Sequence, residues 1–252
     1  MRRAMVTGAS MGIGAAFARR LANDGWAVTL LARSRERLEE LAAELPGQGH
    51  EVLECDLSRP SARELAVARL ADGGWQLLVN NAGFGQVGHF HETGMDRLRD
   101  MMEVNCEAVV ELSHAFLRQA ERGDALVNVA SALGYISNPN MSLYTATKAF
   151  VVALSECLWF ENEGRDVFVL CCAPGITETE FNRNAGRDPR EKRSGLLRQT
   201  PEQVVDETMH ALARRKGPHL VTGVPNRLGV GVARMIGRVG TMRLMARSER
   251  KH

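Results

Sequence analysis

Short apolar runs alternate with longer amphipathic stretches along most of the 252-residue chain, and this alternation limits the possible folds more than any other feature. The short runs are almost continuously hydrophobic, which is typical of strands covered on both faces. They are predicted as strands at residues 4–6, 27–31, 52–55, 77–79, 125–129, 167–172 and 219–221. The amphipathic stretches are predicted as helices at residues 13–24, 34–45, 61–71, 95–119, 142–163 and 200–214.

Strands and helices that follow one another in this order predict a fold of the α/β class. Parallel strands joined by right-handed crossovers give a single-domain, Rossmann-type doubly wound parallel sheet of about seven strands, flanked by helices. No linker divides residues 1–252, and the length suits one such domain. Within it we expect a substrate lid at about 180–200 and a basic amphipathic C-terminal segment at about 226–252.

Composition indicates an ordinary globular protein of the cytoplasm. The formal charge of +2 gives no argument for a nucleic-acid partner, and no metal site is predicted. The five Cys have no paired spacing and indicate reduced, buried thiols. The apolar stretch after Met1 ends at Thr7, too short for a secretory signal, and no run approaches the roughly 18 apolar residues of a membrane span.

A glycine-rich turn joins the first predicted strand to the first predicted helix. Its glycines, spaced G-x-x-x-G-x-G, allow a tight turn and a close approach of backbone to a pyrophosphate, and the helix start offers free N–H groups. The turn therefore predicts a dinucleotide site. Its residues are Gly8, Ser10, Met11, Gly12, Ile13 and Gly14.

The end of the second strand indicates which dinucleotide binds. An acidic residue at this position would hold the ribose 2′-hydroxyl and repel a 2′-phosphate. Here Ala32 is followed by Arg33, and a guanidinium suits phosphate. We therefore expect NADP(H) to be preferred over NAD(H). Arg37 is interpreted as part of a solvated helix start.

Tyr144 and Lys148 are the strongest candidates for chemistry. Four residues apart on a predicted helix, they share one face. At roughly 4 Å and an effective dielectric of about 20, the lysine charge favours the phenolate by about 4 kcal/mol, less the penalty of burial. The pair is therefore a plausible proton donor to a ketone or acceptor from an alcohol. The other tyrosine, Tyr135, has Pro139 at this spacing.

Taken in order, these motifs resemble those of the classical short-chain dehydrogenases/reductases over roughly residues 4–182. Ser131 precedes Tyr144 by 13 residues, the usual separation in that family. The matching positions are the glycine turn, Asp56, Asn80, Asn81, Ala82, Gly83, Asn105, Ser131, Tyr144, Lys148, Pro174, Gly175 and Thr179.

The resemblance implies four catalytic residues. Tyr144 would donate the proton, Ser131 would position the substrate oxygen, and Lys148 would lower the phenol's pKa and bind the nicotinamide ribose. Asn105 would hold a water that links Lys148 to solvent, although an Asn in a helix could merely bond to nearby backbone.

The remaining cofactor contacts are also implied by the resemblance. Asp56 with Leu57 would bind the adenine; the alternative role of Asp56 is to cap a helix or turn, and the two roles are compatible. Asn81, Ala82 and Gly83 would back the adenosine ribose. The nicotinamide carboxamide would be held by Pro174, Gly175, Thr177 and Thr179.

The expected function is hydride transfer between NADP(H) and a small carbonyl or secondary-alcohol substrate. An apolar pocket of Leu133, Tyr135, Met141 and Phe181 favours a hydrophobic ketone or a 3-oxoacyl-type compound. Residues 182–198 hold six Lys or Arg against two acidic residues, either to attract an anionic substrate or as a solvated loop. The alternative is a catalytically silent NADP(H)-binding sensor or scaffold.

The expected assembly is a homodimer or homotetramer. The strand end at Val221 and Thr222 lacks the Gly-Gly of 3-oxoacyl-carrier reductases, which argues against their substrate and their tetramer. In the C-terminal segment, one side carries Met235, Ile236, Val239, Met242 and Met245 among arginines. Packing on the body, on a second subunit or over the cleft is favoured there over contact with a membrane surface.

Overall fold

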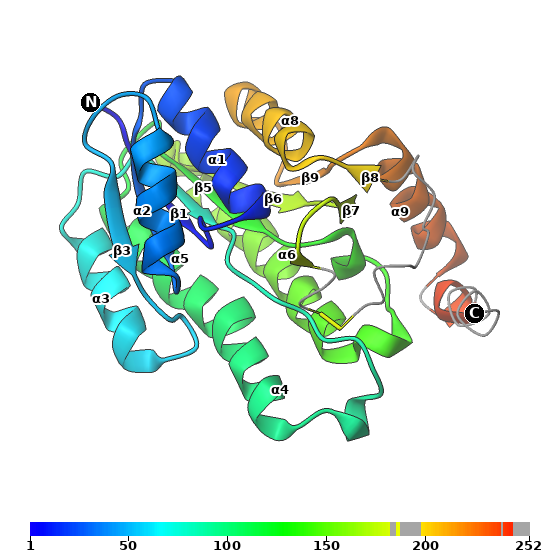
Figure 1. The fold of residues 1–252 in the computed structure, drawn as a ribbon. Coiled ribbons are helices and arrows are strands. Elements are labelled where there is room, and N and C mark those ends of the chain that lie inside the picture. Colours follow the sequence, from blue (N-terminus) through cyan, green and yellow to red (C-terminus); the bar gives the residue numbers. More distant parts are fainter. Residues whose placement is uncertain (182–184, 187–197, 238, 244–252) are drawn as a thin grey trace.

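A seven-stranded parallel sheet forms the centre of the molecule. The computed structural model describes residues 1–181, 185–186, 198–237 and 239–243. The strand order is β3-β2-β1-β4-β5-β6-β9, so the chain reverses direction across the sheet between β1 and β4. The strands are β1 (Arg3–Thr7), β2 (Ala27–Ala32), β3 (Glu51–Glu54), β4 (Leu77–Asn80), β5 (Ala125–Val129), β6 (Phe168–Ala173) and β9 (His219–Val221). The predicted fold class and all seven predicted strands are confirmed (Figure 1).

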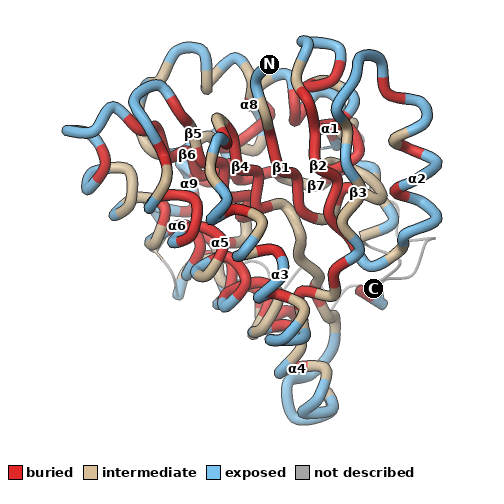
Figure 2. Tube along the Cα trace, turned by 90° about the vertical axis from the view of Figure 1, so that its left-hand side faces the viewer, coloured by how far each residue is buried: buried red, intermediate tan, exposed pale blue. Residues whose placement is uncertain are grey.

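Helices cover both faces of this sheet, which explains why its strands are hydrophobic on both sides. Figure 2 shows the buried strands between α1, α2 and α8 on one side and α3, α5 and α6 on the other. The helices are α1 (Gly12–Asn23), α2 (Arg35–Glu44), α3 (Pro60–Ala71), α4 (Met95–Met102), α5 (Ala108–Gln119), α6 (Ser142–Asn162), α8 (Pro201–Arg214) and α9 (Val224–Ile236).

Two features differ from the sequence prediction. The single helix expected at 95–119 is interrupted by a π-helical stretch, Glu103–Glu107. The sequence did not predict this break, because the amphipathic period continues through it. A short parallel pair, β7 (Ile176–Thr177) with β8 (Arg198–Gln199), was not predicted, since two-residue strands carry no periodic signal.

The C-terminal segment packs differently from the expectation. Val230 and Ala233 of α9 are buried, but the side chains of Met235, Ile236, Val239 and Met242 are exposed. No described residue of the body covers these four, so packing on the body, one of the three arrangements that were favoured, is not formed among the described residues; Met245 lies outside them. Among the described residues, each helix is too short or too polar to span a lipid bilayer.

All five Cys are free thiols, as expected. Cys171 and Cys172 belong to hydrophobic clusters on opposite faces of β6, as neighbours in a strand should. Cys55 and Cys106 are also buried, but Cys157 is exposed on α6, where the expectation of burial was wrong.

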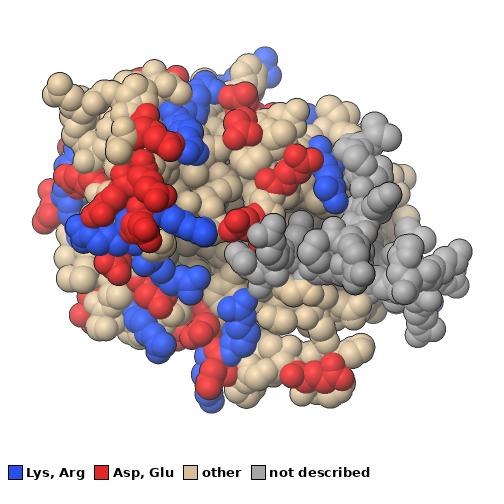
Figure 3. All heavy atoms as spheres, in the orientation of Figure 1, with Lys and Arg blue, Asp and Glu red and all other residues tan. Residues whose placement is uncertain are grey.

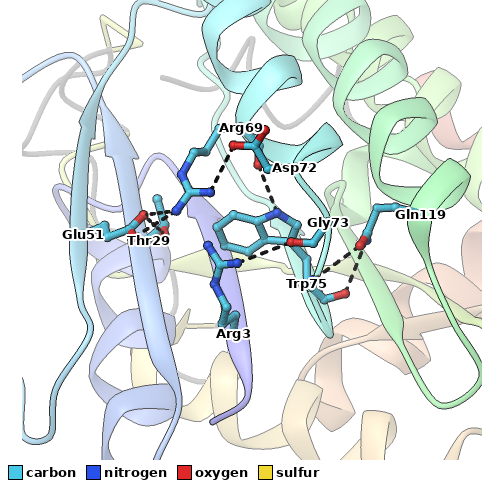
Figure 4. A network of polar contacts seen from close by, with 8 residues as sticks. All are labelled: Arg3, Thr29, Glu51, Arg69, Asp72, Gly73, Trp75 and Gln119. Carbon is cyan, nitrogen blue, oxygen red and sulfur yellow. Dashed lines mark hydrogen bonds and ion pairs between the residues drawn. The ribbon is translucent and has the colours of Figure 1, made fainter.

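Trp75 closes the edge of the sheet at which the strands begin. The indole is fully buried, and its Nε1 donates to the Arg69 carbonyl oxygen at 3.1 Å. The guanidinium carbons of Arg3 and Arg69 lie 4.1 and 5.1 Å from the ring centroid. Arg69 in turn pairs with Glu51 at 2.7 Å, which ties α3 to β3 (Figure 4). The buried indole and the two guanidinium groups that lie against it therefore stabilise this edge of the sheet.

We expect Trp75→Ala to lower the free energy of unfolding by ~3–5 kcal/mol, because it leaves a large cavity under two arginines. Trp75→Phe keeps most of the volume and should lose less than half as much. Urea unfolding measures both values. Cofactor binding by the folded fraction should be unchanged in each variant, since ligands of parallel sheets bind at the opposite strand ends; equal losses in the two variants would contradict this account.

Candidate active site

The residues singled out in the sequence gather where the parallel strands end. The glycine turn follows β1, the loop from Asn81 follows β4, Ser131 follows β5 and Pro174 follows β6. These four strands are neighbours in the sheet, on either side of the point where the strand order reverses. Ligands of doubly wound sheets bind at this point.

The glycine turn is packed so closely that side chains are excluded. Gly8 and Gly12 have φ of +65° and +55°, a left-handed conformation that other residues rarely adopt. A Cβ on Gly14 would overlap the Gly8 carbonyl oxygen, and one on Gly12 would lie 2.9 Å from Cγ2 of Thr179. No side-chain hydrogen bond caps the start of α1 among the described residues. The turn and these uncapped N–H groups fit a dinucleotide pyrophosphate.

Thr7 joins this turn to the loop after β4. Its Oγ1 accepts hydrogen bonds from the backbone N–H of Asn81 and of Ala82, each at 2.9 Å. The Asn81 side chain donates from Nδ2 to the Thr7 carbonyl oxygen at 2.9 Å. The sequence assigned no role to Thr7, although a hydroxyl at the end of an apolar strand was the signal for one.

Asp56 and Arg33 lie at the ends of β3 and β2. Asp56 Oδ1 accepts from the Ser58 N–H at 3.0 Å and from the Ser58 hydroxyl at 2.8 Å, so the alternative role as a turn cap is formed. Partial burial works against the charged form, but the Ser58 bonds and the charges of Arg33 and Arg59 together lower the pKa of Asp56. The adjacent Leu57 is buried in the core.

Arg33 is exposed and makes no hydrogen bond or ion pair with any residue that the structure describes, unlike its two neighbours on α2. Arg35 pairs with Glu39 at 2.7 Å, and Arg37 with Glu180 at 3.6 Å. Arg33 is thus the member of this group whose guanidinium is still available to a phosphate.

Lys148 is a buried ammonium on the same side of α6 as Tyr144. Its Nζ donates to the Val129 carbonyl oxygen at 2.8 Å and lies 5.9 Å from the centroid of the Tyr144 ring. Burial lowers the pKa of Lys148 to about 8, against the opposing influence of the thiols of Cys106, Cys171 and Cys172. The amine can therefore gain or lose a proton near neutral pH.

Asn105 sits in the π-helical stretch between α4 and α5 and is fully buried. Its Nδ2 donates to the Phe84 carbonyl oxygen at 2.9 Å and to Thr147 Oγ1 at 3.0 Å, and its Oδ1 accepts from the Phe84 N–H at 3.0 Å. A Cβ on Gly83 would lie 3.1 Å from this Oδ1 and 3.2 Å from Lys148 Nζ. Asn105 therefore bonds to nearby backbone, as the alternative interpretation of this residue predicted. Its Oδ1 also lies on the same side of Gly83 as the Lys148 ammonium.

Ser131 and the loop after β6 lie next to each other. Ser131 Oγ accepts from the Leu133 N–H at 3.2 Å, and the Ala132 N–H donates to the Pro174 carbonyl oxygen at 2.8 Å. Thr177 Oγ1 donates to the Gly175 carbonyl oxygen at 3.4 Å. With Thr179 against Gly12, this loop meets the glycine turn across the site.

Apolar side chains surround the Tyr144 ring. The cluster contains Met101, Met141, Phe84, Val87, Leu133, Leu143 and Phe181. Leu133, Met141 and Phe181 were expected here, but Tyr135 was wrongly included, because it packs in a different cluster, against β6 and α9. Most of the expected lid at 180–200 lies outside the described residues.

A buried chain of polar groups lies under the site, and of its members the sequence analysis had named only Asn80. Asn80 Nδ2 donates to Asn128 Oδ1 at 2.9 Å, and Asn128 Nδ2 donates to Ser155 Oγ at 3.0 Å. Asn80 and Asn128 stand opposite each other in β4 and β5 and so join the two strands to α6. An Asn inside each of two apolar runs was the available signal.

Comparisons with known proteins agree with this geometry. A family model described as short chain dehydrogenase matches residues 2–190. The chain is 38% identical over 184 residues to nodulation protein G of Rhizobium sp. (strain N33), covering 71% of this chain and 74% of that protein. It is 36% identical over 183 residues to sulfoacetaldehyde reductase of Chromohalobacter salexigens, covering 70% of this chain and 72% of that protein.

A solved short-chain dehydrogenase from Sphingobium yanoikuyae in complex with NADPH has the same fold, with a TM-score of 0.82 at 31% identity over 93% of this chain and 94% of that one. With a seven-stranded parallel sheet, a glycine turn at its switch point and a family model over most of its length, the chain belongs to the short-chain dehydrogenase/reductase family, oxidoreductases that act on CH–OH or C=O groups.

Proposed function

We propose that this protein is an NADP(H)-dependent oxidoreductase whose substrate is a hydrophobic ketone or 3-oxoacyl-type compound and the corresponding secondary alcohol. The observation that carries the proposal is the buried Lys148 ammonium, 5.9 Å from the centroid of the Tyr144 ring. A buried lysine whose pKa lies near neutrality is destabilising, so its presence beside a phenol favours a role in proton transfer.

The nicotinamide, when bound, supplies the hydride chemistry; the side chains manage the proton. In the reductive direction, Tyr144 donates its hydroxyl proton to the substrate oxygen, on which negative charge develops. Ser131 donates a hydrogen bond to the same oxygen and positions it. Lys148 stabilises the phenolate that remains, and its own proton exchanges near pH 8.

The glycine turn, with Asp56, Leu57 and the loop from Asn81 to Gly83, would hold the adenosine half of the cofactor. The loop from Pro174 to Thr179 would hold the carboxamide. The apolar cluster around Tyr144 favours an uncharged, hydrophobic substrate. A silent sensor is disfavoured, because Ser131, Tyr144 and Lys148 are all retained.

A homodimer or homotetramer in the cytoplasm is also part of the proposal. Val110 on α5 and Phe150 and Phe160 on α6 are large apolar residues left exposed. Exposed apolar side chains on these two helices favour self-association through them. The free thiols favour a reducing compartment.

We expect Tyr144→Phe to lower turnover by a factor of at least about 10², because the substrate oxygen loses its proton donor. NADPH affinity should change little. The matched control is Tyr135→Phe, which removes the other tyrosine hydroxyl of the chain and should leave turnover intact. NADPH consumption across β-keto esters, 3-oxoacyl thioesters and steroids measures both variants, and retained turnover in Tyr144→Phe would remove the phenol from the mechanism.

Lys148→Met should abolish turnover and change how stability depends on pH. The pKa of Lys148 is about 8 in the folded protein and 10.5 as the ordinary value, so between these pH values the unfolded state binds more protons and the wild type gains stability as pH rises. The variant has no such gain. Relative to the wild type, its free energy of unfolding should therefore fall by up to ~3 kcal/mol between pH 7 and pH 10.5.

The control for this experiment is Lys216→Met, which replaces an exposed lysine. Chemical unfolding of the cofactor-free proteins across this pH range gives the comparison. Parallel pH curves for wild type and Lys148→Met would mean that the amine is not buried as described.

We expect Arg33→Ala to raise KM for NADPH by about tenfold or more and to leave KM for NADH unchanged, because a charge-assisted bond to the 2′-phosphate is lost. Arg37→Ala removes a guanidinium already paired with Glu180 and should alter neither value. Steady-state kinetics with each cofactor tests this. Wild-type activity with NADH equal to or above that with NADPH would refute the cofactor preference.

A further inference from the structure

Arg63, near the start of α3, is a buried cation that has no role in the proton transfer or in the cofactor contacts described above. Acidic and basic side chains intermix over the surface of α2 and α3 (Figure 3), and in a pair such as Arg35 with Glu39 more than half of each side chain is exposed. Exposed pairs of this kind contribute little to stability. The Arg63 side chain is only 4% exposed, so its charge requires partners inside the protein.

The Arg63 guanidinium is bonded on all of its nitrogens. Nη1 donates to the Leu57 carbonyl oxygen at 3.0 Å and to Glu103 Oε2 at 2.6 Å. Nε and Nη2 donate to the two carboxylate oxygens of Glu111, each at 3.0 Å. Burial works against the charged form, but the bonds to the two glutamates raise the pKa of Arg63 above its ordinary value. The planar guanidinium meets the Glu111 carboxylate with two parallel bonds, a geometry that the single ammonium of a lysine cannot form.

The three partners of Arg63 come from three separate segments of the chain. Leu57 belongs to the turn after β3, which is proposed above to hold the adenine. Glu103 is the first residue of the π-helical stretch and stands two residues before Asn105. Glu111 lies in the first turn of α5, directly after that stretch. The guanidinium therefore joins the adenine turn to the π-helical stretch and also spans the stretch from one end to the other.

From the π-helical stretch the connection continues to α6. Asn105 Nδ2 donates to Thr147 Oγ1 at 3.0 Å, and Thr147 precedes Lys148 in the sequence. Single π-helical turns within α-helices are rare and are frequent at functional sites. Bonds from outside the helix, such as those of Arg63 to Glu103 and Glu111, therefore help to hold this turn and the Asn105 side chain in place.

We propose that Arg63 is a positioning residue that couples the adenine turn to the groups on α6, an inference that rests on the proposed function. Its bond to the Leu57 carbonyl oxygen fixes the turn offered to the adenine. Its bonds to Glu103 and Glu111 fix the π-helical stretch, and so the placement of Asn105 against α6. Loss of the guanidinium weakens cofactor binding and turnover together, whereas loss of the Glu103 carboxylate lowers turnover alone.

The test compares Arg63→Met and Glu103→Ala with two matched controls. Arg69→Met removes a paired guanidinium further along the same helix, and Glu107→Ala removes an exposed carboxylate at the other end of the same π-helical stretch. Calorimetric titration measures binding of adenosine 2′,5′-bisphosphate, which carries only the adenosine half of NADP. Turnover is measured at saturating NADPH, so that weaker cofactor binding does not lower it.

We expect Arg63→Met to weaken binding of the bisphosphate by about fivefold or more, because the adenine turn loses a charge-assisted hydrogen bond. Turnover should fall by about tenfold or more in Arg63→Met and in Glu103→Ala, because the reacting groups are displaced. Glu103→Ala should bind the bisphosphate as the wild type does, since the bond from Arg63 to Leu57 remains. Both controls should match the wild type in both measurements.

The proposal is overturned if Arg63→Met has the affinity and turnover of Arg69→Met, or if Glu103→Ala has the turnover of Glu107→Ala. Circular dichroism checks the fold of each protein. Should Arg63→Met unfold, Arg63→Lys replaces it: the charge is kept, but one ammonium cannot span Leu57, Glu103 and Glu111, so both losses should persist. A wild type that binds neither NADPH nor the bisphosphate would refute the proposed function itself, which distinguishes that failure from a failure of the coupling.

Discussion

The site depends on the close approach of β1 and β4 at the point where the strand order reverses. Three backbone or side-chain amides of Asn81 and Ala82 bond to Thr7, and this contact is possible only because Gly8 and Gly14 have no side chains. The two strand ends are thus held together at the point where ligands of doubly wound sheets bind.

The second constraint is the burial of Lys148, which lowers the stability of the fold. Withdrawal from water lowers its pKa, and a single carbonyl oxygen, that of Val129, accepts its hydrogen bond among the described residues. An apolar residue of similar length would satisfy the core better. Two sets of side-chain hydrogen bonds surround it: Asn105 joins Phe84 to Thr147, and Asn80, Asn128 and Ser155 tie α6 to the sheet. These bonds hold α6, and so the Tyr144 and Lys148 pair, in a fixed position over the strand ends.

The amino and carboxyl ends of the strands have different surroundings. At the amino ends of the strands, Trp75 with Arg3 and Arg69 stabilises the fold and lies far from the chemistry. At the last strand of the sheet, α9 begins beside Gly175, whose missing side chain makes room for Asn226. The α9 helix, whose outer face is apolar, therefore starts beside the loop that follows β6.

The sequence by itself determined what depends on local pattern. Continuous apolar runs predicted the seven strands, glycine spacing predicted the turn after β1, and a four-residue step placed Tyr144 and Lys148 on one face of α6, because period and turn chemistry act over only a few residues. The tertiary structure alone decided what depends on long-range packing. The π-helical stretch Glu103–Glu107 keeps an unbroken amphipathic pattern, so only the folded backbone reveals it, and the bonds of Asn105 to Phe84 and Thr147 are equally long-range. The same holds for the position of Tyr135 and for the exposure of the apolar side of α9. Both depend on which distant elements pack beside them, and a sequence pattern carries no information about neighbours that are remote along the chain.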